Sequence, residues 1–380
     1  MCVAQDGHMR SPRLVDTPAT ARRRSAWVCG VAAIVAATMV LAGCGSSDDS
    51  GDKKETVAPA TASAAPSGPA AAPAGTVVAT PPGSTVLAHS GNALGVLGGD
   101  GTSVLRLSTE AITAAPTTIA VPRLTRLIGV GDGAFVGAGP EILVRIGADG
   151  AVTSARTSVS EPTALARTAS GQILVGTANG HLVVFDAALK QIRDIGGFVG
   201  VDQITVSPAG ADLPDEQVVV LDKAQSSVTP VNISTGEFGA ALRAGYGATE
   251  ATVDHYGRIL VSNTRDDEII GFFGSPLVMR FRYPVPNGPY AVDYDDTRNL
   301  LWVSTTANNE VVAYDLAGGE PVEKHRFAAV AQPDALAVDD ASGTVYVLSA
   351  RDGGVQVVAP PYSQGAPVSS STAAPSEAGR

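Results

Sequence analysis

The chain has 380 residues and contains 26 Lys and Arg against 37 Asp and Glu, which gives a formal net charge of −11 at pH 7. So acidic a protein is repelled by nucleic-acid phosphates and by anionic lipid headgroups, so we expect no nucleic-acid binding. The cysteines are Cys2, Cys29 and Cys44. They cannot form a disulfide framework or a thiolate metal site in the rest of the chain.

The N-terminal region has the organisation of an export signal. Basic residues come first and end in three consecutive arginines at 22–24. An uncharged apolar stretch, 26–42, follows, and the string "LAGC" occupies positions 41–44. That string resembles the lipobox of bacterial lipoproteins: an apolar residue, two small residues and a Cys.

The lipobox resemblance implies a signal peptide over residues 1–43 and cleavage between Gly43 and Cys44. It also implies a diacylglyceryl, palmitate-type anchor on Cys44, which would place the protein on the extracytoplasmic side of the cell membrane. The alternative is a transmembrane anchor, although 17 uncharged residues are at the short limit of a bilayer span. General secretory and twin-arginine export both remain open.

Two segments have the composition of disordered chain. Residues 44–75 and 362–380 are rich in Ala, Pro, Ser, Gly and Thr and poor in large apolar side chains. The first of them would form a flexible tether with a root-mean-square reach of about 30 Å. The first 43 residues hold five Arg and two Asp, so the remaining chain has 21 basic and 35 acidic residues and a net charge of −14. We therefore expect the lipid, rather than a basic patch, to contact the membrane.

Residues 76–361 contain a repeat. Two short strands joined by a polar turn recur as "QILVGTANGHLVVFD", "RILVSNTRDDEIIGFF", "LLWVSTTANNEVVAYD" and "TVYVLSARDGGVQVVA". The spacing is roughly forty residues, and a wider search gives seven repeat starts: Thr85, Leu127, Thr163, Gln203, Glu250, Tyr290 and Ala335. Seven copies of a four-stranded antiparallel unit predict an all-β, seven-bladed β-propeller.

The ends of the repeat array predict how the ring closes. The last repeat has three strands only, whereas "TVVAT" (Thr76–Thr80) precedes the first repeat without a partner. We predict that this N-terminal strand completes the last blade of a monomeric ring. The repeat resembles the YVTN and NHL families of bacterial propellers, which implies the fold and leaves the function open.

The loops that lead into the first strand of each blade should surround one mouth of the central channel. Five polar residues fall there: Glu161, Asp202, Glu250, Asn287 and Asp334. Carboxylate and amide oxygens suit Ca²⁺, so one interpretation is a divalent cation site. Gluconolactonase-type propellers have such a site, and the likeness is one of topology. The other interpretation is structural: each carboxylate accepts backbone N–H groups and locks neighbouring blades together.

Other polar positions are interpreted as structural. Aspartates at the ends of strands should form Asx turns: Asp186, Asp254, Asp293, Asp315 and Asp339. The turns between second and third strands, such as those with Lys223 or Arg265, suit ordinary hairpins or the rim of a binding site. No nucleophile elbow, zinc-protease helix or phosphate-binding glycine loop occurs.

These observations favour a lipid-anchored propeller that is not an enzyme and presents a binding or scaffold face to a protein, peptide, glycan or other cell-envelope ligand. A metal-dependent hydrolase or lyase of the gluconolactonase type is the alternative. No cofactor is expected beyond a possible divalent cation such as Ca²⁺.

Overall fold

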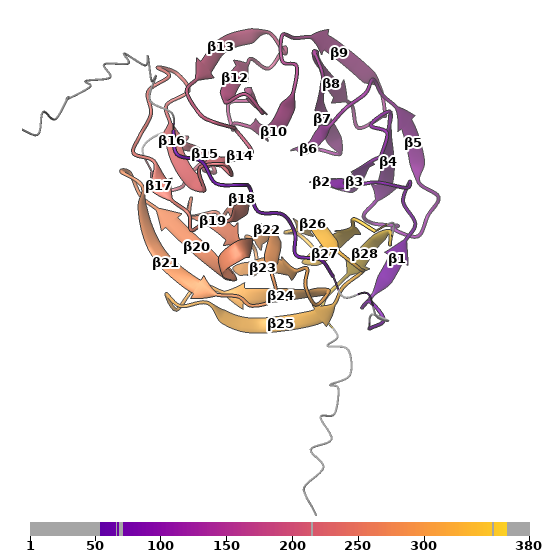
Figure 1. Ribbon diagram of the computed structural model, residues 1–380. Coiled ribbons are helices and arrows are strands. Elements are labelled where there is room, and N and C mark those ends of the chain that lie inside the picture. The colour runs from indigo at the N-terminus through magenta and orange to yellow at the C-terminus, as the bar shows by residue number, and fades with distance from the viewer. Residues whose placement is uncertain (1–53, 66, 68–70, 214–215, 352, 363–380) are drawn as a thin grey trace, which may run out of the picture. The chain divides into compact units, whose positions relative to one another are not determined.

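The computed structural model describes residues 54–65, 67, 71–213, 216–351 and 353–362. In this part of the chain, seven four-stranded antiparallel sheets surround a central channel (Figure 1), which confirms the seven-bladed β-propeller. The predicted signal peptide, Gly43, Cys44 and residues 363–380 lie outside the described residues. Within them, no helix is both long and apolar enough to cross a bilayer.

The strands run in chain order, four to a blade. Blade 1 contains β2 (Val86–Ser90), β3 (Ala93–Leu97), β4 (Ser103–Ser108) and β5 (Thr117–Ala120). Blade 2 contains β6 (Arg126–Gly131), β7 (Ala134–Gly139), β8 (Ile142–Ile146) and β9 (Val152–Arg156). Blade 3 contains β10 (Pro162–Arg167), β11 (Ile173–Thr177), β12 (His181–Phe185) and β13 (Gln191–Gly196). Blade 4 contains β14 (Gln203–Val206), β15 (Val218–Asp222), β16 (Ser227–Val231) and β17 (Leu242–Arg243).

The remaining blades follow the same order. Blade 5 contains β18 (Ala248–Val253), β19 (Ile259–Asn263), the short 3-10 helix η1 (Thr264–Asp266), β20 (Glu268–Phe273) and β21 (Val278–Pro284). Blade 6 contains β22 (Pro289–Asp295), β23 (Leu300–Thr305), β24 (Glu310–Asp315) and β25 (Val322–Ala328). Blade 7 contains β26 (Pro333–Asp339), β27 (Thr344–Ser349), β28 (Val355–Val358) and β1 (Thr76–Val78). The seven predicted repeat starts agree with these first strands to within two residues.

The position of a strand in its blade explains its sequence. Second strands such as β11, β19 and β23 are buried along their whole length because a neighbouring blade covers each face of the sheet. They therefore read as continuous apolar runs rather than alternating ones. Fourth strands such as β13 and β21 form the outer edge and are mostly exposed, with charged and apolar side chains mixed along them.

The hydrophobic core is divided between the blades. Buried apolar side chains of the described residues form seven clusters, and each cluster joins two adjacent blades. One of them joins the first and last blades through Leu94 and Leu105 of blade 1 and Tyr346 of blade 7. No blade has a core of its own, so only the complete ring buries this surface.

An N-terminal strand lies in the last blade. β1 pairs antiparallel with β28, with Thr76 opposite Val357 and Val78 opposite Val355. Blade 7 thus consists of three C-terminal strands and one N-terminal strand, and the two ends of the ring meet within one sheet.

Two segments predicted to be disordered contact the ring. Residues 54–65 lie across one face of it (Figure 1), and the Val57 N–H donates to the Ala224 carbonyl at 2.7 Å. Tyr362 donates its hydroxyl to the Gly343 carbonyl at 2.6 Å and packs edge-on against Trp302. The expectation of free chain is wrong at these positions, because backbone groups and one aromatic ring make contacts that composition does not reveal.

Candidate functional site

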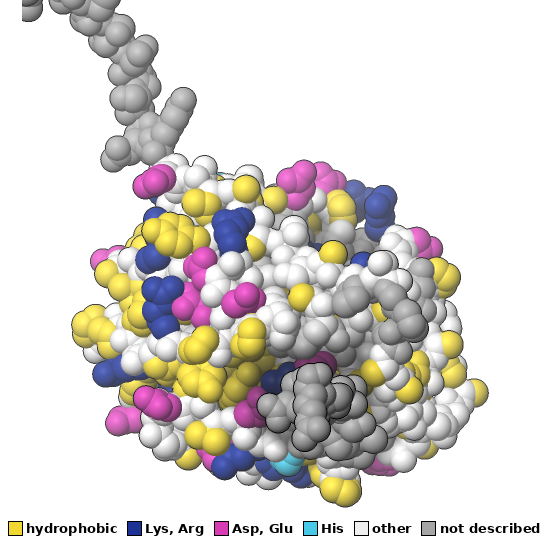
Figure 2. Space-filling model, turned by 60° about the horizontal axis from the view of Figure 1, so that its bottom comes forward, with side chains coloured by type: hydrophobic (Ala, Val, Ile, Leu, Met, Phe, Trp, Pro, Cys, Tyr) yellow, Lys and Arg dark blue, Asp and Glu magenta, His cyan; other side chains and the backbone are white. Residues whose placement is uncertain are grey.

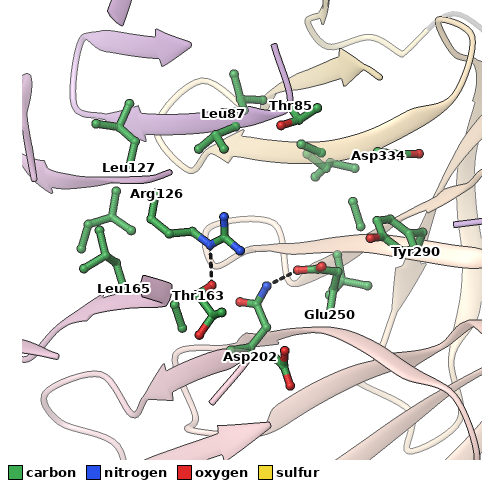
Figure 3. A pocket seen from close by; sticks show the side chains of 18 of the residues that line it. Thr85, Leu87, Arg126, Leu127, Thr163, Leu165, Asp202, Glu250, Tyr290 and Asp334 are labelled. Carbon is green, nitrogen blue, oxygen red and sulfur yellow. Dashed lines mark hydrogen bonds between the residues drawn. The ribbon is translucent and has the colours of Figure 1, made fainter. Parts of the chain in front are cut away.

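The first strands of all seven blades line a central cavity of about 500 Å³. At one end, the loops that lead into these strands form its mouth together with the turn between β15 and β16, which carries Lys223. Figure 3 shows that blades 1–3 contribute apolar side chains such as Leu87, Leu127 and Leu165 to the wall. Blades 4–7 contribute most of the charged and hydroxyl groups: Asp202, Lys223, Glu250, Tyr290 and Asp334.

Glu250 is the centre of a hydrogen-bond network at the mouth. Lys223 Nζ donates to Glu250 Oε1 at 3.1 Å, and Gln203 Nε2 donates to Glu250 Oε2. Because Glu250 comes from blade 5 and its partners from blade 4, the network joins two blades. Burial alone would lower the pKa of Lys223, but Glu250, Tyr290 and Asp202 together raise it above its ordinary value. Lys223 therefore stays protonated beside Glu250.

The other two carboxylates at the mouth are partly satisfied by local donors. Asp202 Oδ2 accepts the backbone N–H of Lys223 at 2.8 Å, and Asp334 Oδ1 accepts Gln332 Nε2 at 2.9 Å. Burial raises the pKa of both Asp202 and Asp334 above the usual carboxyl range. For Asp202 the N–H and charge of Lys223 oppose this rise.

A second cation enters the channel from the apolar half. Arg126 reaches into it from blade 2 (Figure 3) and donates to the backbone carbonyls of Thr163 and Thr125. Burial lowers its pKa, while Glu250 and Asp202 act in the opposite direction. The mouth is therefore a mixed-charge site, with two cations among three carboxylates.

Three of the five predicted mouth residues lie together, and two lie elsewhere. Asp202, Glu250 and Asp334 line the cavity. Glu161 is exposed and lines a shallow surface hollow beside Pro140. Asn287 is exposed in the left-handed conformation at φ 75°, and its carbonyl accepts the Ala307 N–H. Among the described residues, no group of three or more His, Cys, Asp and Glu has the arrangement of a metal site.

Sequence reasoning missed the cations. Arg126 occupies the same lead-in position as the predicted carboxylates, so the signal for it was present. Lys223 follows β15 in a turn that sequence assigns to an ordinary hairpin or to the rim of a binding site, and only the fold shows that its side chain reaches the channel. Tyr290, a further residue of the cavity wall, was recognised only as a repeat start.

The strand-end aspartates are structural, as predicted, with one difference of position. Asp186, Asp254, Asp315 and Asp339 each accept a backbone N–H two residues ahead. Asp293 lies within β22 rather than at a turn. Its Oδ2 accepts the Val338 N–H at 2.9 Å and its Oδ1 faces the Thr252 hydroxyl at 3.4 Å, so it links blade 6 to both neighbours.

Neither a family model nor a curated protein sequence matches this chain. Solved structures do share its fold. Virginiamycin B lyase from Staphylococcus aureus matches with 13% identity and a TM-score of 0.58, over 72% of this chain and 94% of that one. A streptogramin B lyase matches with 13% identity and a TM-score of 0.60, over 74% and 95%. Hydrazine synthase of Kuenenia stuttgartiensis matches with 13% identity and a TM-score of 0.62, over 76% and 99%. At this identity the likeness shows the β-propeller fold alone, which is consistent with a YVTN- or NHL-like repeat.

Proposed function

We propose that this chain is an extracytoplasmic lipoprotein whose β-propeller binds a protein, peptide or cell-envelope ligand at the mouth of its channel. The signal pattern of residues 1–43 and the "LAGC" string support export and lipidation at Cys44. On the face that Figure 2 brings forward, basic and acidic side chains are interspersed with hydrophobic ones. This mixture fits attachment through a lipid better than through a basic patch.

The pairing of charges at the mouth is the observation that carries a binding role. A divalent cation would need oxygen ligands free of other partners. Here Lys223 and Gln203 already occupy both oxygens of Glu250, and Arg126 adds a second positive charge. Such a mixed set of donors and acceptors suits recognition of a polar ligand through hydrogen bonds.

The described histidines give no support to acid–base catalysis in the cavity. His89, His181, His255 and His325 are all absent from its lining. Virginiamycin B lyase from Staphylococcus aureus, by contrast, has been solved with quinupristin in a catalytically inactive His-to-Ala form. In this chain no described histidine lines the cavity for such a role.

Photo-crosslinking in cells tests the binding role. A photoreactive residue replaces Glu161 on the mouth face or, as the matched control, Thr297 in the β22–β23 turn on the opposite face; both positions are exposed. We expect one discrete adduct from position 161 and none from position 297. Equal adducts from the two positions, or none from either, would contradict a mouth-specific ligand.

A metal-dependent hydrolase or lyase remains the second candidate, because three carboxylates do line the mouth. Thermal melts with EDTA and then Ca²⁺, Mg²⁺, Mn²⁺ or Zn²⁺ separate the two. A cation bound only by the folded state at a hundred times its Kd would stabilise it by about 2.7 kcal/mol. We expect no shift. A rise of several degrees that is lost in Glu250→Ala would favour the enzyme instead.

Mass spectrometry of the mature chain tests the anchor separately. We expect an N-terminus at Cys44 that carries a diacylglyceryl group. If residues 1–43 are still present in the mature chain, the lipoprotein proposal is wrong and a membrane-spanning anchor is favoured.

A further inference from the structure

An extended segment of the chain follows the mouth of the propeller. We call residues 57–65 the mouth strap. At its start, the Val57 N–H donates to the Ala224 carbonyl at 2.7 Å, and the Ala58 carbonyl accepts Arg265 Nη2 at 2.7 Å. The strap thus begins on the mouth-face turns of blades 4 and 5, and Figure 1 shows it running from there towards blade 7.

Gln332 binds the end of the mouth strap through both atoms of its amide. Its Nε2 donates to the Ser63 carbonyl at 3.0 Å, and its Oε1 accepts the Ala65 N–H at 3.0 Å. Arg351 donates to the Ala65 carbonyl at 3.4 Å. A carbonyl and an N–H two residues apart are what an extended strand offers to a partner, so this glutamine recognises backbone conformation.

The surface beneath the strap leaves little room at two positions, Ala60 and Ser63, where a small side chain of the strap faces a glycine of the ring. A Cβ on Gly288 would lie 2.7 Å from the Cβ of Ser63, and one on Gly247 would lie 3.1 Å from the Cβ of Ala60. Two glycines therefore leave room for the chain at its closest approach. The strap sequence, Val-Ala-Pro-Ala-Thr-Ala-Ser-Ala-Ala, meets this requirement.

The strap contacts lie beside the cavity. Ala224 follows Lys223, Gly288 precedes Tyr290 by two residues, and Gln332 precedes Asp334 by two. Lys223, Tyr290 and Asp334 all line the cavity. Whatever occupies the strap position therefore lies against the mouth of the channel over blades 4–7.

We propose that this rim of blades 4–7 is a binding site for an extended peptide of small residues, and that the mouth strap is its cis ligand, which a partner segment of similar chemistry displaces. The inference rests on the binding role proposed above and names its ligand class. Its hydrogen bonds go to backbone groups, so the site selects extended shape rather than one sequence, and the two glycines select small side chains at the positions of Ala60 and Ser63. Ten residues, 66–75, connect the strap to β1, and a linker of that length gives an effective concentration on the order of 1 mM.

Competition between an added peptide and the chain's own strap tests whether both bind the same site. A fluorescent peptide with the strap sequence is titrated into the full chain and into a full chain whose residues 57–65 are replaced by Pro and Glu, with Pro at positions 57 and 65, because Pro has no backbone N–H to donate and Glu exceeds the small side chains of the strap. Because a cis ligand at that concentration must be displaced first, we expect binding at least about tenfold tighter in the replaced chain. Equal affinities, or no binding to the replaced chain, would overturn the proposal.

Matched arginine variants locate the peptide. In the strap-replaced chain, Arg265→Ala should weaken peptide binding severalfold, because Arg265 donates to the strap. Arg243→Ala is the control. Arg243 is also exposed and donates to a backbone carbonyl of the propeller, that of Gln225, but it does not donate to the strap. Equal losses in the two variants would contradict this binding position.

Hydrogen exchange gives a readout that needs no added peptide. In the unaltered chain we expect protection of the Val57 and Ala65 amides, because both N–H groups have partners, and loss of the Ala65 protection in Gln332→Ala, which removes the acceptor oxygen. Exchange at the rate of unstructured chain would show that the strap is not bound. A concentration-dependent dimer would place the strap on a second copy and overturn the cis assignment.

The two proposals fail in different ways. A chain that captures a ligand from the mouth face equally well with and without its strap would keep the binding role and lose the cis ligand. Cation-dependent turnover would replace the binding role, while the exchange of the strap amides would be unaffected.

Discussion

Glu250 lies within β18 and Asp254 directly follows its last residue, and the two carboxylates have different partners. Glu250 faces the cavity and bonds to the side chains of Gln203 and Lys223. Asp254 is fully buried on the opposite face, accepts the N–H groups of Tyr256 and Arg258, and forms an ion pair with the Arg258 side chain. Two acids four residues apart thus serve different surroundings: one lines the cavity and the other closes a buried turn.

The turn that Asp254 closes exists in other blades with a different acceptor. In blade 3 the Thr168 hydroxyl accepts the Gln172 N–H at 3.0 Å, and in blade 4 the Ser207 hydroxyl accepts the Gln217 N–H at 2.7 Å. A hydroxyl is therefore sufficient for the turn itself. The carboxylate of blade 5 adds Arg258, which also reaches the Leu316 carbonyl of blade 6 at 3.4 Å. The difference indicates that the opposite face uses charge to join blades.

Asp254→Ala should have the largest effect on stability. It leaves the Arg258 guanidinium without its buried partner and two backbone N–H groups without acceptors, so we expect a loss of about 3–5 kcal/mol. Thr168→Ala, the matched turn with a neutral acceptor, should lose about 1 kcal/mol. Urea unfolding of both variants measures the difference. Equal losses in the two variants would show that the charge of Asp254 adds nothing to the stability of this turn.

The seam of the ring should come next. Replacing Thr76–Thr80 by Gly and Ser at equal length removes the β-branched side chains of β1 and weakens its pairing with β28, which would then become an edge strand more often. A loss of about 3 kcal/mol would lower the melting temperature of a ring of this size by about 5 °C. Differential scanning calorimetry measures it. An unchanged melt would mean that the ring closes through the interblade core alone.

Asp293, which lies within β22 between the two faces of the ring, gives a test of how stability depends on pH. Burial raises its pKa to about 7 in the folded chain, against an ordinary value of 3.8. Between these pH values the folded state binds more protons than the unfolded state, so the free energy of unfolding should decrease as pH rises from about 4 to 7. Asp293→Asn keeps an oxygen for the Val338 N–H and removes the titration. We expect the variant to be at least as stable as the parent at pH 8 and to show a flatter stability profile from pH 4 to 7.

The ring was predictable from sequence because its physical cause is repeated. Each second strand is covered on both faces, and runs such as "LLWVST" and "TVYVLS" therefore recur at the spacing of one blade. Interblade packing constrains every copy in the same way, so a departure from the pattern in one blade does not hide the repeat.

The residues of the mouth were less predictable from sequence, because the direction in which a side chain points depends on the pairing register of its strand. Bulges shift the pairing of β10, β18 and β26 near their starts, so equal distance from a strand start does not give equal orientation. Glu161 and Asp202 each precede a first strand by one residue, yet only Asp202 lines the cavity. The mouth strap left no pattern at all, because its partners bind backbone groups that every residue has.

Glu250→Gln should have the smallest effect on stability and sharpens the contrast with Asp254. The amide keeps the shape of the side chain and an oxygen for one of its two donors, and Lys223 retains Asp202 as a nearby negative charge. We expect a loss of about 1 kcal/mol or less, the size of one hydrogen bond. The yield of the photo-crosslinked adduct from position 161 should nevertheless change, because the donors and acceptors at the mouth are rearranged. A loss as large as that of Asp254→Ala would show that Glu250 too completes the fold, and the ligand would then have to bind outside the channel.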